Sequence, residues 1–154
     1  ISSAAAIRRS QRIFIFAHDI SKILGEFLES RLHLLSFQAV LIDLEDQEKT
    51  QEYLHQLQEG DMVILFSFPK YYYPIGSIAK KAAGEGVPIL TITDSATSPA
   101  AQYSTHLLIC QTTTKMFYNS LTLPMVTLNL LASCLVIDTV PASQRTDFKK
   151  SLSS

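Results

Sequence analysis

The sequence has 154 residues, of which 47% are hydrophobic and 18% are charged, and its formal net charge is -1. This length suits one domain with a core large enough to fold without disulfides, and the composition is too apolar for a disordered chain. The near-neutral charge argues against nucleic-acid binding by the chain alone, because phosphate neutralisation needs clustered Lys and Arg. Only 5 glycines are present, so functions that depend on a glycine-rich phosphate loop are disfavoured.

The ends of the chain and its apolar stretches give no sign of a membrane segment. The sequence begins at Ile1 rather than at Met, so we expect a fragment of a longer protein. Residues 1–10 lack the apolar core of a signal peptide and predict an amphipathic helix. The longest apolar stretch, residues 121–137, is interrupted by polar residues and a proline, and it falls short of the ~20 residues that span a bilayer. We therefore expect a cytoplasmic protein with no membrane contact.

Taken in chain order, short apolar runs alternate with helical patterns. Five runs rich in β-branched or aromatic residues predict strands that are covered on both faces. These runs are residues 12–16, 38–42, 62–66, 88–93 and 106–110.

The helical patterns fall between these runs. Apolar residues at helical spacing from Ile20 to Leu32 predict a helix after the first strand, and a weaker stripe begins near Asp46 after the second. Pro74 suits the first turn of a third helix, which is expected to stop at Gly84.

The last third of the chain predicts two more helices and a polar tail. Ser98 followed by Pro99 predicts a short helix, and residues 120–138 predict a long one. Alternating strands and helices indicate parallel βαβ units. We therefore predict one α/β domain over residues 1–140, a three-layer α/β/α sandwich with a five-stranded parallel sheet. Residues 141–154 are expected to form a frayed polar tail.

In such a sheet, ligands bind beyond the carboxyl ends of the strands. The first loop to inspect contains Ser21, which would lie in the first turn of a helix. Free N–H groups and the helix dipole favour an anion there, and the hydroxyl can donate to a phosphate. The alternative, in which Ser21 is only a residue of the turn and binds nothing, is equally open. His18 and Asp19 allow a general-base interpretation, but helix capping and loop surface are favoured for both.

The second loop, residues 67–73, is unusual for an anion site because Pro69 lacks an N–H group and no glycine permits close approach of a ligand. Lys70 can supply a positive charge. Three consecutive tyrosines, residues 71–73, cannot all point into one pocket, so we expect one or two to pack on the sheet edge or on a partner subunit. The third loop, residues 94–98, is expected to form a turn and to cap the next helix.

The residue types that carry catalysis or bind metals do not assemble by spacing. The histidines are scattered, and no pair of His or Cys residues has metal-ligand spacing. Nucleophile-elbow, Walker and dinucleotide-binding patterns do not occur. Cys110 and Cys134 lie in apolar stretches, which favours core packing over reactivity. We expect no catalytic group, no metal and no cofactor, and hence a protein that is not an enzyme.

Four segments in the same order resemble motifs of the sugar isomerase (SIS) domain, and in particular of the effector domain of RpiR-type bacterial transcription regulators. Residues 12–21 (RIFIFAHDIS) resemble a strand followed by Gly-x-Gly-x-Ser. Residues 60–67 (GDMVILFS) resemble Gly-Asp, an apolar strand and Ser. Residues 79–94 (AKKAAGEGVPILTITD) and 98–107 (SPAAQYSTHL) are similar to the family's Ala-Lys to Ile-Thr stretch and its Ser-Pro-Leu-Ala turn.

The resemblance implies a flavodoxin-like fold and a homodimer that senses a phosphorylated sugar or amino sugar. It also implies an amino-terminal helix-turn-helix domain, outside this chain, that binds DNA. Carried over to this sequence, the family's pocket would use Ser21, Ser67 and Lys70 as anion contacts, with His18 and Tyr72 as pocket walls.

The sequence departs from the family pattern in both loops. The family's phosphate loop reads Ser-x-Ser-Gly-x-Thr, and here only Ser67 matches, because Pro69, Lys70 and Tyr72 replace the other three residues. In the first loop, Ala17 and Asp19 replace both glycines. An Asp carboxylate near a phosphate is repulsive.

The helix predicted over residues 120–138 supports a dimer independently. Its apolar residues cover nearly all its faces, so the helix must be buried on every side. One face of an outer helix in a three-layer sandwich stays exposed unless a second subunit covers it. We therefore predict a homodimer in which this helix is central.

Three functions remain open. The favoured one is the effector domain of a transcription regulator with an altered sugar-phosphate site. The alternatives are a sugar-phosphate isomerase on the same fold, which the absence of glutamate from the three loops disfavours, and a degenerate domain that keeps only dimerisation.

Overall fold

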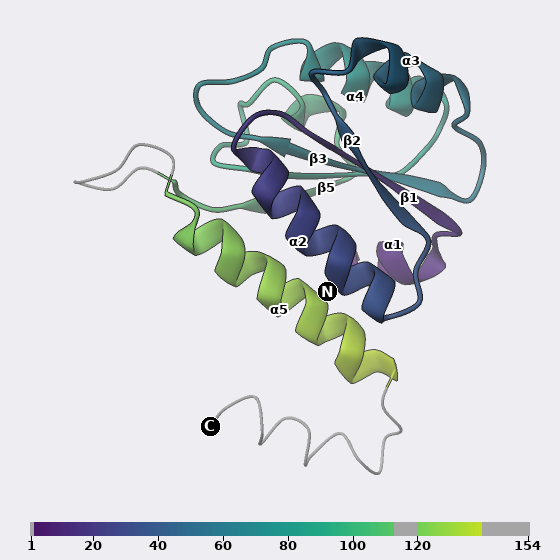
Figure 1. The fold of residues 1–154 in the computed structure, drawn as a ribbon, viewed down its shortest axis with the longest axis vertical. Coiled ribbons are helices and arrows are strands. Elements are labelled where there is room, and N and C mark those ends of the chain that lie inside the picture. Colours follow the sequence, from purple (N-terminus) through teal and green to yellow (C-terminus); the bar gives the residue numbers. More distant parts are fainter. Residues whose placement is uncertain (1, 113–119, 140–154) are drawn as a thin grey trace.

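The computed structural model describes residues 2–112 and 120–139 (Figure 1). Its helices are α1 (Ser2–Arg9), α2 (Ser21–Leu34), α3 (Gln47–His55), α4 (Ile75–Gly84) and α5 (Thr122–Thr139). Its strands are β1 (Arg12–Ala17), β2 (Ala39–Asp43), β3 (Asp61–Ser67), β4 (Ile89–Thr93) and β5 (His106–Ile109).

The strands form one five-stranded parallel sheet in the order β2-β1-β3-β4-β5. Ile15 in β1 lies opposite Leu41 in β2 and Ile64 in β3, so the register is in step across the centre of the sheet. The chain runs outward from β1 to β2 and then returns to add β3 on the other side of β1. The order therefore reverses between β1 and β3, which is the position where parallel α/β sheets bind ligands.

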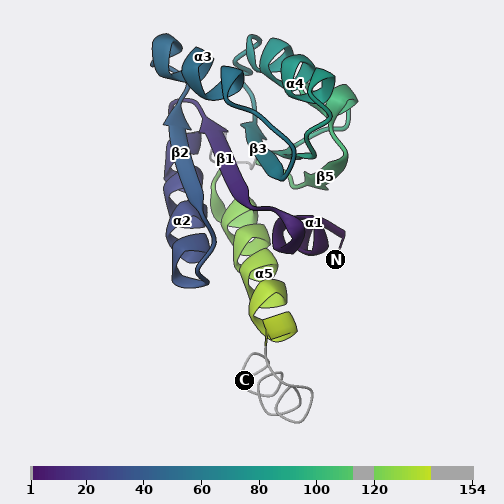
Figure 2. The same cartoon turned by 90° about the vertical axis from the view of Figure 1, so that its right-hand side faces the viewer.

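Helices cover both faces of the sheet, as Figure 2 shows. One layer contains α1, α2 and α5, and the other contains α3 and α4. Alternate residues of each central strand enter the two cores, because successive side chains of a strand point to opposite faces. Ile13 and Ile15 pack toward α2 and α5, whereas Phe14 and Phe16 pack toward α3 and α4. The predicted three-layer α/β/α sandwich is confirmed.

One of the predicted elements needs correction, and another falls outside the described residues. The short helix predicted at Ser98 and Pro99 is only a 3-10 turn, η1 (Ala101–Tyr103), because the chain tightens into i to i+3 hydrogen bonds such as Ala101 N–H to the Ser98 carbonyl at 3.1 Å. The tail predicted over residues 141–154 lies outside the described residues. Among the residues that the structure describes, no helix is long and apolar enough to cross a bilayer.

The Gly-Asp pair that precedes β3 has a clear structural role. Gly60 has a φ of 95°, in the left-handed region that favours glycine. Asp61 is 2% exposed and accepts hydrogen bonds from Arg12 Nε and Nη2, both at 2.8 Å, and from the Gln58 N–H group at 2.9 Å. The turn into β3 is therefore tied to the start of β1 through a buried carboxylate.

Side chains of α2 bind the open edge of β2, which is a terminal strand of the sheet. The Leu41 N–H group donates to Glu29 Oε2 at 2.7 Å, and His33 Nε2 lies 2.6 Å from the Ala39 carbonyl oxygen. These two backbone groups face away from β1. Such contacts satisfy edge groups that would otherwise invite pairing with another chain.

We expect Glu29→Ala to lower the free energy of unfolding by about 1–2 kcal/mol and to increase aggregation, because the Leu41 N–H group loses a charged acceptor. Glu26→Ala is the matched control, since Glu26 is exposed on the same helix and makes no such contact with β2. Urea denaturation and light scattering measure the two effects. Equal stability and solubility of the two variants would contradict the assigned role of Glu29.

Candidate functional site

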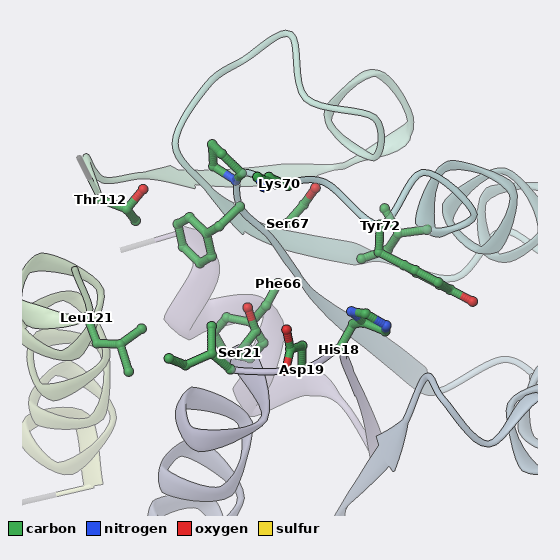
Figure 3. A pocket seen from close by; sticks show the side chains of 13 residues that line it. His18, Asp19, Ser21, Phe66, Ser67, Lys70, Tyr72, Thr112 and Leu121 are labelled. Carbon is green, nitrogen blue, oxygen red and sulfur yellow. The ribbon is translucent and has the colours of Figure 1, made fainter. Parts of the chain in front are cut away.

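A cavity of about 230 Å³ lies at the carboxyl ends of β1 and β3, where the strand order reverses (Figure 3). Its size is slightly below the roughly 300–1,000 Å³ typical of small-molecule sites, so it suits a ligand about the size of a monosaccharide. All five residues predicted from the sequence line it, namely His18, Ser21, Ser67, Lys70 and Tyr72. Side chains that are far apart in the sequence, such as Ser21 and Ser67, are thus brought together by the pairing of β1 with β3.

Ser67 ends β3 and carries a buried hydroxyl group that faces the cavity. The residue is 3% exposed, and its Oγ makes no hydrogen bond among the described residues. Its backbone carbonyl is satisfied, because Thr93 Oγ1 donates to it at 2.6 Å. A buried hydroxyl without a partner costs about 1–3 kcal/mol, and such groups require an explanation. Here the hydroxyl lines a cavity, so a water or a ligand in that cavity could supply the missing partner.

Ser21 begins α2 on the opposite side of the cavity and is 8% exposed. Fewer backbone N–H groups are available to an anion at the start of α2 than the sequence predicts. The N–H groups of Ser21, Lys22 and Ile23 already donate to the carbonyls of residues 18–20, at 3.0–3.1 Å. The N-cap residue Ile20 makes no side-chain cap, so the predicted capping by His18 or Asp19 side chains is wrong. The hydroxyl of Ser21, rather than the backbone, is the donor available here.

One wall of the cavity is a stacked aromatic pair. The rings of His18 and Tyr72 are 4.3 Å apart with an interplanar angle of 11°. The three tyrosines diverge as predicted, since Tyr71 donates its hydroxyl to Asp94 Oδ1 at 2.6 Å and Tyr73 is 71% exposed. The Tyr71 contact fixes the second loop to the end of β4, so the loop presents Tyr72 to the cavity.

Among residues 2–112 and 120–139, the formally charged groups that line the cavity are Asp19 and Lys70. Asp19 has a φ of 54°, in the left-handed region that Asp and Asn tolerate better than other non-glycine residues. The loop therefore keeps a backbone shape suited to glycine while it carries a carboxylate. In Figure 3 the oxygens of Asp19 and Ser21 point toward the loop that carries Ser67 and Lys70.

The cavity also contains residues that the sequence did not predict. Thr112 follows β5 and Leu121 precedes α5, and both line the cavity. Predicting them requires the position of α5 beside α2, which no local pattern reveals. The third candidate loop, residues 94–98, does not line the cavity, and Asp94 instead accepts the Tyr71 hydroxyl. This loop belongs to the β4 side of the sheet, away from the reversal in strand order.

Two larger hollows exist, but neither shows the same sign of a ligand. One, of about 600 Å³, lies at the amino ends of the strands, and the other, of about 460 Å³, lies between α3 and α4. The unpartnered buried side-chain atoms among the described residues are Ser67 Oγ and Ser98 Oγ, and neither residue lines these hollows. The buried hydroxyl of Ser67, rather than the cavity volume, therefore identifies the cavity at the ends of β1 and β3 as the candidate site.

The two cysteines behave as the sequence predicts for core residues. Cys110 is 8% exposed beneath α5, and burial raises the pKa of its thiol despite the hydrogen bond with Thr127. Cys134 is half-buried on α5. Within residues 2–112 and 120–139, no three His, Cys, Asp or Glu side chains are grouped closely enough to hold a metal ion.

Solved structures share this fold. The sugar isomerase domain of an RpiR transcription factor from Sphaerobacter thermophilus has a TM-score of 0.84 and 22% identity, over 99% of this chain and 83% of that one. The Vibrio vulnificus NanR protein complexed with ManNAc-6P has a TM-score of 0.77 and 16% identity, over 99% of this chain and 57% of that one.

An Escherichia coli CFT073 protein in complex with A5P has a TM-score of 0.75 and 14% identity, over 96% of this chain and 82% of that one. A search of curated proteins finds no match. A family model described as the SIS domain matches residues 6–134, which include β1 to β5 and most of α5. The chain therefore belongs to the SIS domain family.

Proposed function

We propose that this chain is the effector-binding domain of an RpiR-type transcription regulator, and that it binds a phosphosugar in the cavity between β1 and β3. The observation that carries the proposal is the Ser67 hydroxyl, which is buried at the strand-order reversal without a hydrogen-bond partner among the described residues. Ser21 Oγ and the Lys70 ammonium complete a set of donors suited to a phosphate. DNA contacts would be made by a domain outside this chain, in the cytoplasm.

Two solved structures of this fold support the ligand class. The NanR protein was solved with ManNAc-6P, and the Escherichia coli protein was solved with A5P. Both ligands were seen in those proteins, and the donors that line the present cavity suit the same chemistry.

We further propose that the domain forms a homodimer through residues 120–138. On α5, Leu123 is 50% exposed, Val126 is 48% exposed and Leu130 is 62% exposed. These residues form one stripe, because residues three and four apart share a helix face. A second copy of the chain would cover this stripe, as the apolar character of all faces of α5 requires.

Binding without catalysis is the proposed mode of action. His18 lies flat against Tyr72, and the loops around the cavity contain no glutamate. Asp19 and His18 are the candidates for acid–base chemistry in the cavity. Their presence is the observation that favours the alternative of a sugar-phosphate isomerase. A dimerisation-only domain is the other alternative, suggested by the loss of the family's phosphate-loop pattern.

A thermal-shift panel of hexose and hexosamine phosphates tests the proposal. At a hundredfold excess over the dissociation constant, a true ligand is expected to raise the melting midpoint by roughly 5–10 °C. Ser67→Ala is expected to weaken binding at least about tenfold, because it removes a buried donor. The same variant should fold at least as stably as the wild type, since the hydroxyl it removes is unsatisfied.

Ser98→Ala is the matched control, because Ser98 Oγ is also buried and has no partner within residues 2–112 and 120–139, but it lies outside the cavity. Its ligand affinity should equal that of the wild type. Unchanged melting curves across the whole panel would favour the dimerisation-only domain. Conversion of any phosphosugar by the purified chain would favour the isomerase.

A further inference from the structure

We propose that the cavity prefers a phosphosugar that also carries a free ammonium group, and that Asp19 is the residue that selects it. This inference rests on the proposed function, since it adds a second charge to the phosphosugar already assigned to the site. Among the lining residues that the structure describes, Asp19 supplies one negative charge and Lys70 one positive charge. A site with both signs complements a zwitterion, whereas a simple hexose phosphate meets an uncompensated carboxylate.

The backbone at Asp19 has a conformation that does not require an aspartate. Its left-handed φ of 54° is the conformation that a glycine would adopt without cost. The side chain therefore changes the charge of the cavity and not the path of the loop. Asp19 is exposed, and no hydrogen bond or ion pair engages its carboxylate among the residues that the structure describes.

Lys22, in the first turn of α2, forms its ion pair with a carboxylate other than that of Asp19. Lys22 Nζ lies 3.1 Å from Asp43 Oδ2, and Lys22 does not line the cavity. The hydrogen bond to Asp43 is the main cause of the raised pKa of Lys22, and Asp19 is the smallest contributor. Asp43 is thus the principal partner of Lys22, which leaves the Asp19 carboxylate available to a ligand.

The position of Asp19 relative to the anion donors fits a small zwitterion. Asp19 and Ser21 belong to the loop after β1, whereas Ser67 and Lys70 belong to the loop after β3 on the other side of the cavity (Figure 3). A phosphate held by Ser67 and Lys70, with Ser21 Oγ donating to it from the facing loop, would leave the sugar ring beside that loop, which also carries Asp19. An amino substituent on that ring would then meet the carboxylate.

Isothermal titration calorimetry of the 154-residue chain tests the preference. The probes are matched sets of a hexose 6-phosphate, its 2-amino-2-deoxy derivative and the N-acetylated form of that derivative, each in the gluco, manno and galacto configurations. We expect the amino phosphate of the fitting configuration to bind about tenfold more tightly than its two counterparts, which is a typical effect of one charge-assisted hydrogen bond.

Asp19→Asn removes the charge while it keeps the size of the side chain and a residue that tolerates left-handed φ. In this variant the preference for the amino phosphate should vanish, and the hexose phosphate should bind more tightly than it does to the wild type. Glu45→Gln is the matched control, because Glu45 is an exposed carboxylate at the same end of the sheet but outside the cavity. It should leave all affinities unchanged.

The possible failures are distinguishable. Equal binding of the three forms, or tighter binding of the hexose or N-acetylated phosphate to the wild type, would overturn the role of Asp19 and leave the proposed function intact. An amino preference that persists in Asp19→Asn would likewise overturn it. Absence of binding by every probe would overturn the proposed function itself, and this inference with it.

Discussion

Replacing Leu130 with aspartate is expected to convert a dimer, with twice the 17.1 kDa mass of one chain, into a monomer. Leu130 is 62% exposed and lies in one stripe with Leu123 and Val126. In an interface related by a twofold axis, each copy contributes the same patch, so one substitution places two carboxylates in the apolar contact. Burying an unpaired carboxylate costs several kcal/mol, which exceeds what a modest interface can tolerate. Multi-angle light scattering measures the mass.

Ile109→Asp is the matched control for this experiment. Ile109 is an apolar residue of similar exposure, 54%, but it lies on edge strand β5 and alternates with Leu108, which packs toward the α5 layer. Ile109 therefore faces the opposite side of the sheet. A monomeric Ile109→Asp variant together with a dimeric Leu130→Asp variant would place the interface at β5 and contradict the role of α5. A monomeric wild type would exclude the dimer.

Replacing Arg12 with alanine is expected to lower the free energy of unfolding by about 3–5 kcal/mol, because it leaves a buried carboxylate without its cation. Asp61 is 2% exposed and accepts two hydrogen bonds from the guanidinium, each at 2.8 Å. The hydrogen bond to Asp61 also raises the pKa of Arg12, against the opposing effect of desolvation. The guanidinium lies 5.1 Å from the centre of the Phe14 ring, so packing is lost as well. Denaturation with guanidinium chloride measures the change in the free energy of unfolding.

Lys22→Ala is the matched control, since it removes the cation of an exposed ion pair. Its ammonium lies 3.1 Å from Asp43, and the two side chains are 32% and 40% exposed. Solvent screening weakens such an exposed pair, so we expect a much smaller loss of stability than for Arg12→Ala. If Arg12→Ala destabilised the protein no more than Lys22→Ala, the buried carboxylate would not be the source of the stability.

The small contribution of the Lys22 pair should depend on pH. Burial alone would raise the pKa of Asp43, but hydrogen bonds from the Glu45 N–H group and the Lys22 ammonium outweigh it, so the pKa is lowered. A lowered folded-state pKa contributes stability above the ordinary carboxyl pKa, and this stability is lost as the pH falls through the folded value. The wild type and Lys22→Ala should therefore converge in stability in acid.

The sequence by itself determined the order of the elements and the end of the sheet at which a ligand site is expected. Continuous apolar runs such as residues 62–66 identify central strands, because a strand covered by helices on both faces has no polar face to alternate with. Alternation with helices then requires parallel strands, whose carboxyl ends share one edge. This reasoning placed Ser21, Ser67 and Lys70 in one cavity.

Only the tertiary structure decided which loops meet and which atoms lack partners. Residues 94–98 have the same local pattern as the other two loops, but they follow β4, which is not adjacent to the reversal in strand order. Thr112 and Leu121 line the cavity because the entry to α5 lies beside the start of α2. Likewise, only the packing shows that the Ser67 hydroxyl is buried without a partner in the part of the chain that the structure describes, since hydrogen bonding there depends on residues distant in sequence.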